Sequence, residues 1–281
     1  MMLRQTLNGS IRSITRLVVA LVAGLILTGS AVAQNLGTIG TDLWYTVGEE
    51  GWGVTIDHQQ NVLFLTFYIY RSDGSPYWVT AVLNKVGTSG LATTPQVFTG
   101  NVFEDHGPYF GGAFNTANVS ETTVGTATLT SSSFTTATLQ YSVNGVNVSK
   151  NLQRLTLSYI NYSAQYLGGT SYTSSSCVNP GQNGTTIVDS GTLTVNQSGT
   201  SFQMIAHGQT VNCTFTGTYS QAGTLGQVDG TYSCSDTTTG PFTFYAMQWT
   251  LFGMSAGARG SNQFCSFDGY LGGITNQHVV P

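Results

Sequence analysis

Residues 48–79 read GEEGWGVTIDHQQNVLFLTFYIYRSDGSPYWV and hold the densest run of large apolar and aromatic side chains in the chain. Apolar residues alternate with others along much of this stretch, which is typical of strands that turn one face toward a core. Gln59–Gln60 and Asp73–Gly74 interrupt the alternation, and Asp-Gly is a strong signal for a two-residue hairpin loop. The stretch therefore predicts consecutive antiparallel strands joined by two hairpins.

The expected hairpins also predict which side chains share a face. A two-residue loop at Asp73–Gly74 would place Ile69 opposite Trp78, and residues opposite each other lie on the same face of a sheet. We expect the interior face to carry Trp52, Val54, Ile56, Leu63, Leu65, Phe67, Ile69, Trp78 and Val82. We expect the opposite face to carry Gly53, Thr55, Asp57, Phe64, Thr66, Tyr68, Tyr70, Tyr77 and Val79.

The composition of the whole chain favours an all-β fold. Charged residues make up 7% of it, against about 25% in ordinary globular domains, and β-branched and aromatic residues outweigh strong helix formers. Short alternating segments recur between turn signals such as SDGS, NQSGT and VNGV, a pattern of sandwiches and barrels. We predict two tandem, antiparallel, up-and-down β-barrels of about eight strands each, over residues 34–162 and 163–281.

The N-terminus has the features of a cleaved signal peptide. Arg4, Arg12 and Arg16 precede the apolar run LVVALVAGLIL and the small residues of TGSAVAQ, in the order of a charged region, an apolar region and a cleavage site. We predict cleavage after Ala33, so residues 1–33 would be removed and the protein would be secreted or periplasmic. A retained anchor is the alternative, although the run is shorter than the about 20 residues that span a bilayer.

The charge distribution argues against several classes of partner. Three of the eight basic residues precede the expected cleavage site and all twelve acids follow it, so the basic patches that nucleic acids require are missing. Many of the expected strands are shorter than the about 9–11 residues of membrane-spanning strands, so we do not expect a membrane-embedded barrel. Histidines occur singly and CxxC spacing is absent, which predicts neither a metal nor another cofactor.

The four cysteines lie in the C-terminal half, and an even number in an exported chain favours disulfides. If SQAGTLGQ closes a hairpin with a six-residue loop, Cys213 falls opposite Cys234, at a separation that a disulfide can bridge. Cys177 and Cys265 would then join the start of the second barrel to its end. The sequence leaves two other connectivities open.

Several segments resemble a recurrent module of secreted bacterial proteins, usually seen as ESGWG followed by YDxDGxPxW. They are EEGWGVTI, LFLTFYIYRSDGSPYWV, GPYFGGAF, VGTATLT and GVNVSKNLQRLTL. The segments CTFTGTYSQAGTLGQVDGTYSCS and FCSFDGYLGGI resemble the domain that often follows it. The chain departs from the pattern at Glu50, where Ser is common, and near GYLGGI, where an Arg is usual. This family has no established activity, so the resemblance implies architecture and export only, as does a distant likeness to lipocalin and avidin barrels.

We expect a non-catalytic protein that binds a small hydrophobic ligand, a glycan or a protein partner. An apolar cavity in the first barrel would form the site, whereas a filled barrel would move binding to its outer tyrosines, whose rings carry a polar tip. Packing between the domains is a further interpretation of those tyrosines. The candidate ligand-binding residues are Trp52, Phe67 and Trp78 inside, and Tyr68, Tyr70 and Tyr77 outside.

A secreted hydrolase is the alternative from another class. The segment GMSAG at 253–257 fits the G-x-S-x-G motif, and Asp268 and His278 follow it, but that motif needs a strand, a turn and a helix. Glycosidases use two carboxyl groups on either side of the bond, as Glu49–Glu50 and Glu104–Asp105 could supply. A hydrolase would bring at least two of Glu50, Glu104, His207, Ser255 and Asp268 into one cleft. A structural or surface-assembly component is the third interpretation.

Overall fold

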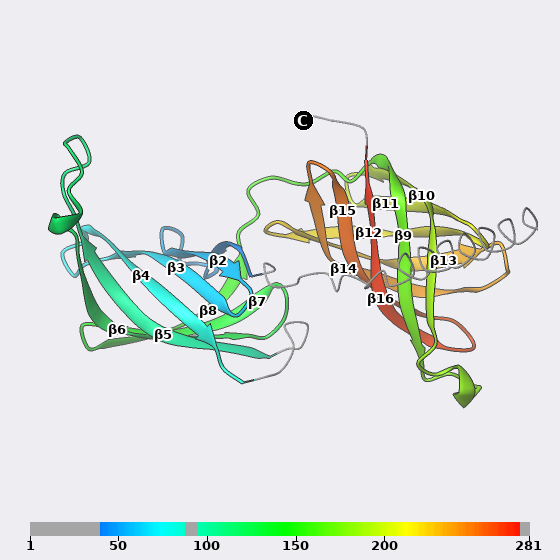
Figure 1. Ribbon diagram of the computed structural model, residues 1–281, viewed down its shortest axis with the longest axis horizontal. Helices are drawn as coiled ribbons and strands as arrows, with labels where there is room; N and C mark the ends of the chain where they lie inside the picture. The colour runs from blue at the N-terminus through cyan, green and yellow to red at the C-terminus, as the bar shows by residue number, and fades with distance from the viewer. Residues whose placement is uncertain (1–39, 88–94, 276–281) are drawn as a thin grey trace, which may run out of the picture. The chain divides into compact units, whose positions relative to one another are not determined.

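The computed structural model describes residues 40–87 and 95–275. These residues form two closed antiparallel barrels of eight strands each, in which neighbouring strands are consecutive in sequence and the last strand pairs with the first (Figure 1). The predicted all-β fold with two up-and-down barrels is confirmed. The predicted signal peptide, residues 1–33, lies outside the described residues. Within the described ranges, no helix has the length and apolar character needed to cross a bilayer.

The first barrel is built from the N-terminal half of the described chain. Its strands are β1 (Asp42–Tyr45), β2 (Gly53–Gln59), β3 (Val62–Tyr70), β4 (Pro76–Lys85), β5 (Gln96–His106), β6 (Ser120–Ser131), β7 (Thr136–Val143) and β8 (Val146–Arg154). A short 3-10 turn, η2 (Thr116–Asn118), lies in the β5–β6 connection. That connection extends beyond the ends of its strands (Figure 1).

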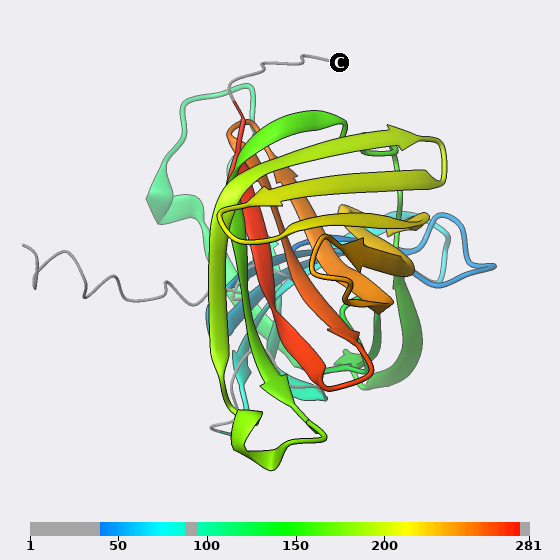
Figure 2. The ribbon, with the colours of Figure 1, turned by 90° about the vertical axis from the view of Figure 1, so that its right-hand side faces the viewer.

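The second barrel follows after residues 155–163. Its strands are β9 (Ala164–Ser175), β10 (Thr186–Ser198), β11 (Ser201–Gly208), β12 (Asn212–Ala222), β13 (Leu225–Cys234), β14 (Thr239–Thr250), β15 (Gly253–Ser261) and β16 (Ser266–Ile274). A 3-10 turn, η3 (Pro180–Gln182), lies in the β9–β10 connection, at one end of this barrel (Figure 2).

The hairpin between β3 and β4 differs from the sequence prediction. Its strands end at the pair Tyr70 and Pro76, so the loop has five residues instead of two. The Asp73 carboxylate accepts hydrogen bonds from the Ser75 backbone N–H at 2.9 Å and from the Ser75 hydroxyl at 2.7 Å. Asp73 thereby stabilises a local side-chain turn, and Asp73–Gly74 does not close the hairpin alone.

An odd-numbered loop changes which side chains point inward, because a shift of one residue moves each side chain to the other face. Ile69 pairs with Tyr77 and Tyr68 pairs with Trp78. The predicted inward positions of Trp78 and Val82 are therefore wrong, as are the predicted outward positions of Tyr77 and Val79. The β2–β3 hairpin has the expected parity, because its loop is two residues long.

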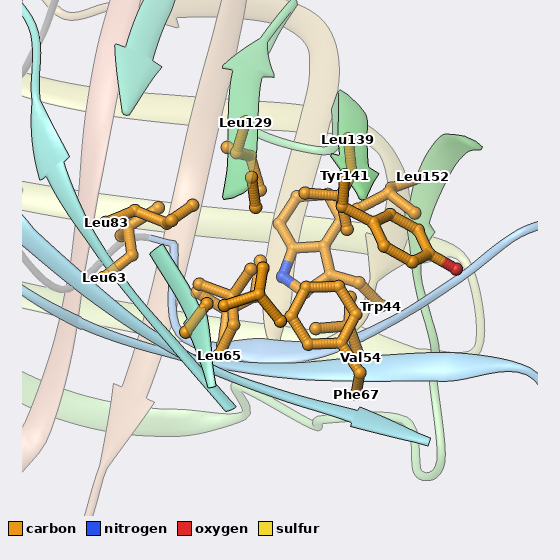
Figure 3. Close-up of a cluster of buried hydrophobic side chains, with 14 of the residues drawn as sticks. Trp44, Val54, Leu63, Leu65, Phe67, Leu83, Leu129, Leu139, Tyr141 and Leu152 are labelled. Atoms are coloured by element: carbon orange, nitrogen blue, oxygen red, sulfur yellow. The ribbon is translucent and has the colours of Figure 1, made fainter. Parts of the chain in front are cut away.

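Large apolar side chains fill the interior of the first barrel. Figure 3 shows Val54, Leu65, Phe67 and Tyr141 directed toward one another from β2, β3 and β7. The Phe67 ring is fully buried, and its centroid lies 5.0 Å from that of Tyr141. Burial of each such side chain contributes about 1.5–3 kcal/mol, so this core supplies much of the stability of the barrel.

Two predictions about the second barrel are confirmed by its strand register. Tyr219 pairs with Val228, and Cys213 pairs with Cys234 and forms a disulfide with it. The pairing continues past the expected loop to Ala222 and Leu225, so the turn has two residues instead of six.

The second predicted disulfide joins Cys177 to Cys265. Cys177 follows β9 and Cys265 precedes β16, the two strands whose pairing closes the barrel. The bond therefore ties together the connections on both sides of the closing seam.

One end of the second barrel is closed by the segment that leads into β9. The Tyr162 side chain is fully buried in the core of this barrel, although our expected boundary placed the residue in the first domain. Its hydroxyl donates to the Met247 carbonyl at 3.0 Å, and its own carbonyl accepts from the Tyr166 hydroxyl at 2.8 Å. Burial raises the pKa of Tyr162 and raises that of Tyr166 to about 12, so both phenols stay neutral at ordinary pH.

Candidate functional site: a cavity in the second barrel

A cavity of about 560 Å³ occupies the second barrel, and all eight strands contribute to its lining. It reaches the end of the barrel that is opposite Tyr162. At that end, the connections β9–β10, β11–β12, β13–β14 and β15–β16 provide lining residues that we call the rim: Gln182, Thr210, Asp236 and Asn262. In an up-and-down barrel, alternate connections lie at the same end, which explains why these four meet.

One wall of the cavity is a cluster of aromatic rings on β12, β13 and β14. The ring centroid of Phe215 lies 5.6 Å from that of Tyr232, 5.1 Å from that of Phe242 and 5.2 Å from that of Phe244. Phe242 and Phe244 are 4.5 Å apart and both are buried. Such tilted and edge-to-face pairs add to the energy of burial and hold the rings in fixed orientations.

A second pair of rings faces the cavity from the closing seam. Tyr172 of β9 and Phe267 of β16 pack edge to face, with ring centroids 5.3 Å apart. Leu193 on β10 and Leu271 on β16 also line the space and are buried. The cavity thus has mainly apolar walls and aromatic rings on two sides.

The space exists because several inward positions carry very small side chains. Gly191, Ala206, Gly208, Ala258 and Gly260 all line it. Gly191 also allows close approach of the chains, since a Cβ there would lie only 1.8 Å from the His207 carbonyl oxygen. Glycine at such positions permits the sharp bend of a barrel strand and removes a side chain that would otherwise fill the interior.

The polar groups of the cavity are gathered near the rim. Asp189, Tyr172, Tyr232 and Asp236 all line it. Burial raises the pKa of Tyr172, and the negative charges of Asp189 and Asp236 raise it further. Burial also raises the pKa of Tyr232, with smaller contributions from Tyr172 and Asp236. The four groups therefore act on one another electrostatically within a shared space.

Basic side chains are directed away from this space. Arg259 is the one Lys or Arg in residues 164–275, and its guanidinium carbon lies 5.4 Å from the ring centroid of Tyr245. Tyr245 is an outward residue that packs against Gly257, and Asp268 pairs with Arg259 across β15 and β16. His207 and Arg259 both border the cavity, but they occupy outward positions: His207 is exposed and alternates with Met204 and Ala206 on β11, and Arg259 is exposed and alternates with Ala258 and Gly260 on β15. No positive side chain of the described part of this barrel thus points into the cavity.

The predicted interior site of the first barrel is only partly assembled. Trp52 stacks on Tyr141 with ring centroids 6.5 Å apart, and its indole N–H donates to the Tyr141 hydroxyl at 3.2 Å. Phe67 packs on the same tyrosine. Trp78 does not join them, because the five-residue loop directs it outward, where it is 55% exposed.

The predicted outer site is also rearranged. Tyr68 and Tyr70 are exposed on β3, as expected. Trp78, which we expected inside the barrel, lies on the outer face opposite Tyr68. Tyr77 is buried instead, with the Arg71 guanidinium carbon 3.8 Å from its ring centroid. The outer face of β3 and β4 therefore carries Phe64, Tyr68, Tyr70, Trp78 and Val82.

The hydrolase candidates do not form a catalytic arrangement. Ser255 lies inside strand β15 and pairs with Gly272, so it is not at the strand–turn–helix elbow that the motif requires. Asp268 on β16 pairs with Arg259, which lies four residues after Ser255 on β15. His207 belongs to β11, which is not a neighbour of β15 or β16, and His278 lies outside the described residues.

Glu104 and Glu49, two of the candidate carboxylates of the first barrel, form ion pairs. Glu104 forms an ion pair of 3.0 Å with Arg71, and the Arg71 guanidinium followed by the Tyr77 hydroxyl lowers the pKa of Glu104. Glu49 forms an ion pair with Lys150, while Glu50 is an exposed turn residue. Within residues 40–87 and 95–275, no three His, Cys, Asp or Glu side chains are grouped so that they could hold a metal ion.

No protein-family model, curated protein or solved structure matches this chain. The residues of the cavity were missed by the sequence analysis, which assigned the ligand site to the more aromatic first barrel. A usable signal was the series of glycines and alanines that alternates with the outward residues of β10, β11 and β15. Small inward residues on several strands of one barrel indicate an unfilled interior.

Proposed function

We propose that the chain is a non-catalytic binding protein whose second barrel takes up a small hydrophobic ligand. The cavity of about 560 Å³ supports this proposal most directly, because ligand sites are usually concave, mostly apolar and of about 300–1,000 Å³. The fixed aromatic rings on two sides favour a flat, ring-containing ligand. Barrels of eight strands are just wide enough to hold one small molecule when their inward residues are small.

Export of the protein is the second part of the proposal. The arrangement of Arg4, Arg12 and Arg16 before an apolar run supports a signal peptide cleaved after Ala33. The two disulfides support an oxidising destination, in the periplasm or outside the cell. A binding protein in such a place would sequester or carry its ligand.

The test is a titration of the disulfide-bonded protein with N-phenyl-1-naphthylamine, an apolar dye that fluoresces strongly on leaving water. We expect saturable binding by the unaltered protein. A double variant, Ala206→Phe with Ala258→Phe, would fill the cavity from β11 and β15 and should weaken binding at least tenfold. Circular dichroism and the thermal midpoint of each variant establish that it is folded.

The matched control is Trp78→Ala, which removes a large aromatic ring from the outer face of the first barrel. This variant should bind the dye as the unaltered protein does. Loss of dye binding in Trp78→Ala, with binding retained in the double variant, would move the site to the outer face of β3 and β4. Absence of saturable binding by the unaltered protein would overturn the proposal.

A further inference from the structure

The position of Asp189 suggests which kind of hydrophobic molecule the cavity would accept. Asp189 lies on β10 at an inward position, two residues from Gly191 and four from the buried Leu193. With a rise of about 3.3 Å per residue, Asp189 and Leu193 are separated by roughly 13 Å along the strand. The carboxylate thus lies toward the rim, and an apolar channel continues below it.

The carboxylate of Asp189 is held in place by backbone groups. Its Oδ1 accepts hydrogen bonds from the backbone N–H of Ser190 at 2.9 Å and of Gln209 at 3.0 Å. Its Oδ2 lies over Gly208, where an added Cβ would come within 1.9 Å of it. Among the described residues, no side chain or backbone donor forms a hydrogen bond with Oδ2. One carboxylate oxygen is therefore fixed at the cavity wall without a partner.

The glycine at position 208 has a specific consequence for this site. Any larger residue there would displace the Asp189 side chain from its place, so the two residues are sterically linked. Because Gly191 pairs with Gly208 across β10 and β11, the wall on the β11 side of the carboxylate has no side chain, whereas Thr170 lies opposite Asp189 on β9. The oxygen remains accessible from inside the barrel.

The charge around Asp189 is not balanced within the cavity. Asp236, a second acid, lies at the rim, while the Arg259 guanidinium lies on the outer surface beside Tyr245 and Asp268. Asp189 is half-buried, so its charge is screened less than that of a fully exposed carboxylate, and an anionic ligand would be repelled and a cationic one attracted. Aromatic faces add to this preference, because their quadrupoles attract cations.

We infer that the cavity selects a cationic amphiphile, an amine or quaternary ammonium with an apolar ring-bearing body. The cationic group would bind Asp189 near the rim, beside Tyr172 and within reach of the field of Asp236. The apolar body would lie against Phe242 and Phe244 and extend toward Leu193. This inference rests on the proposed function, since it names the ligand class of the same cavity.

The test compares two molecules of the same shape and different charge. They are (2-naphthylmethyl)trimethylammonium and its neutral carbon analogue 2-neopentylnaphthalene, each used to displace bound N-phenyl-1-naphthylamine from the disulfide-bonded protein. We expect the cation to displace the dye at a concentration at least tenfold lower than the neutral analogue. Asp189→Asn should remove most of that preference while leaving displacement by the neutral analogue unchanged, because Asn can still accept the two backbone hydrogen bonds.

Asp268→Asn is the matched control, because it removes a carboxylate from the outer surface of the same barrel. It should leave the preference for the cation as it is in the unaltered protein. Equal displacement by the two molecules, or an undiminished preference in Asp189→Asn, would overturn the inference while dye binding still supported a hydrophobic cavity. Absence of dye binding would overturn the proposed function itself, so the two failures are distinguishable.

Discussion

The two barrels have the same number of strands and the same order of connections, yet one is filled and the other contains a cavity beside its core. Inward positions of β3 in the first barrel carry Leu63, Leu65, Phe67 and Ile69. Inward positions of β11 in the second barrel begin with the buried Phe202 and Met204 and continue with the small Ala206 and Gly208 beside the cavity. Backbone topology alone therefore does not make a container. The volume of the inward side chains decides whether eight strands enclose a core or a cavity.

The comparison extends to what stabilises each barrel. A cavity removes apolar contacts that a filled core would provide, and the barrel with the cavity is also the one that contains both disulfides. Cys213–Cys234 lines the cavity directly, and Cys177–Cys265 ties two connections at its rim. Covalent bonds thus act where the packing is least complete.

Reduction of the disulfides should have the largest effect on stability, and it should distinguish the two barrels because only the second contains these bonds. The two bonds close loops with sequence separations of 88 and 21 residues, and loop closure of this size is worth roughly 4.6 and roughly 3.3 kcal/mol in the chain-entropy treatment. We expect reduction to lower the unfolding free energy of the second barrel by several kcal/mol and to leave the first barrel unchanged. Hydrogen exchange followed by mass spectrometry, peptide by peptide, measures both barrels at once.

Replacing one inward alanine by leucine in each barrel compares the packed interior of the first with the cavity of the second. Ala81 is fully buried opposite Leu65 in the first barrel, whereas Ala258 borders the cavity opposite Phe244. Ala81→Leu should destabilise the first barrel by about 1–3 kcal/mol, because a packed core resists added atoms. Ala258→Leu should be neutral or should stabilise the second barrel by about 0.5–2 kcal/mol, because it fills empty space.

Urea unfolding of the two variants provides the measurement. If Ala258→Leu destabilised its barrel as much as Ala81→Leu does, the interior of the second barrel would be packed, and the cavity would not be available to a ligand. If Ala81→Leu cost nothing, the first barrel would also contain usable space, and the original expectation of a site near Phe67 would regain support.

The sequence predicted the architecture well because its signals were local. Turn residues and alternation specify strands one at a time, and eight of them in each half close naturally into barrels. The Cys213–Cys234 pair was predicted because the real two-residue loop and the expected six-residue loop share the same centre, so the register of the two strands is unchanged. The Asp73 hairpin was mispredicted because two residues became five, and an odd change moves every side chain of β4 to the other face.

The functional site was harder to predict for a different physical reason. Inward orientation follows from alternation along one strand, but free volume depends on residues from all eight strands at once. The abundance of aromatic residues in residues 48–79 pointed to the first barrel, and there those side chains pack on one another. Asp189 offered no motif, since its role depends on Gly208 of the next strand and on the absence of inward basic groups in the described barrel.

Acid pH should have the smallest effect on stability. In contrast to reduction of the disulfides, it should destabilise the first barrel and not the second. His58 is 4% exposed in the first barrel; its Nδ1 accepts from the Gly40 backbone N–H at 3.1 Å and its Nε2 lies 2.7 Å from the Gln60 carbonyl oxygen. Burial, reinforced by the charge of Arg154, lowers the pKa of His58. His207, the histidine in the described part of the second barrel, is exposed.

Because the folded pKa of His58 lies below the unfolded value of about 6.5, the unfolded chain binds more protons between the two values. The stability due to neutral His58 is therefore complete above pH 6.5 and is lost as the pH falls below it, by at most about 1.4 kcal/mol per pH unit. Unfolding midpoints measured between pH 7.5 and pH 5 should fall for the first barrel and stay constant for the second, with the fall removed by His58→Gln and unaffected by His207→Gln. Equal losses in both barrels would show that acid acts on a feature the barrels share, since a neutral imidazole fixed between two backbone groups occurs in only one of the two described barrels.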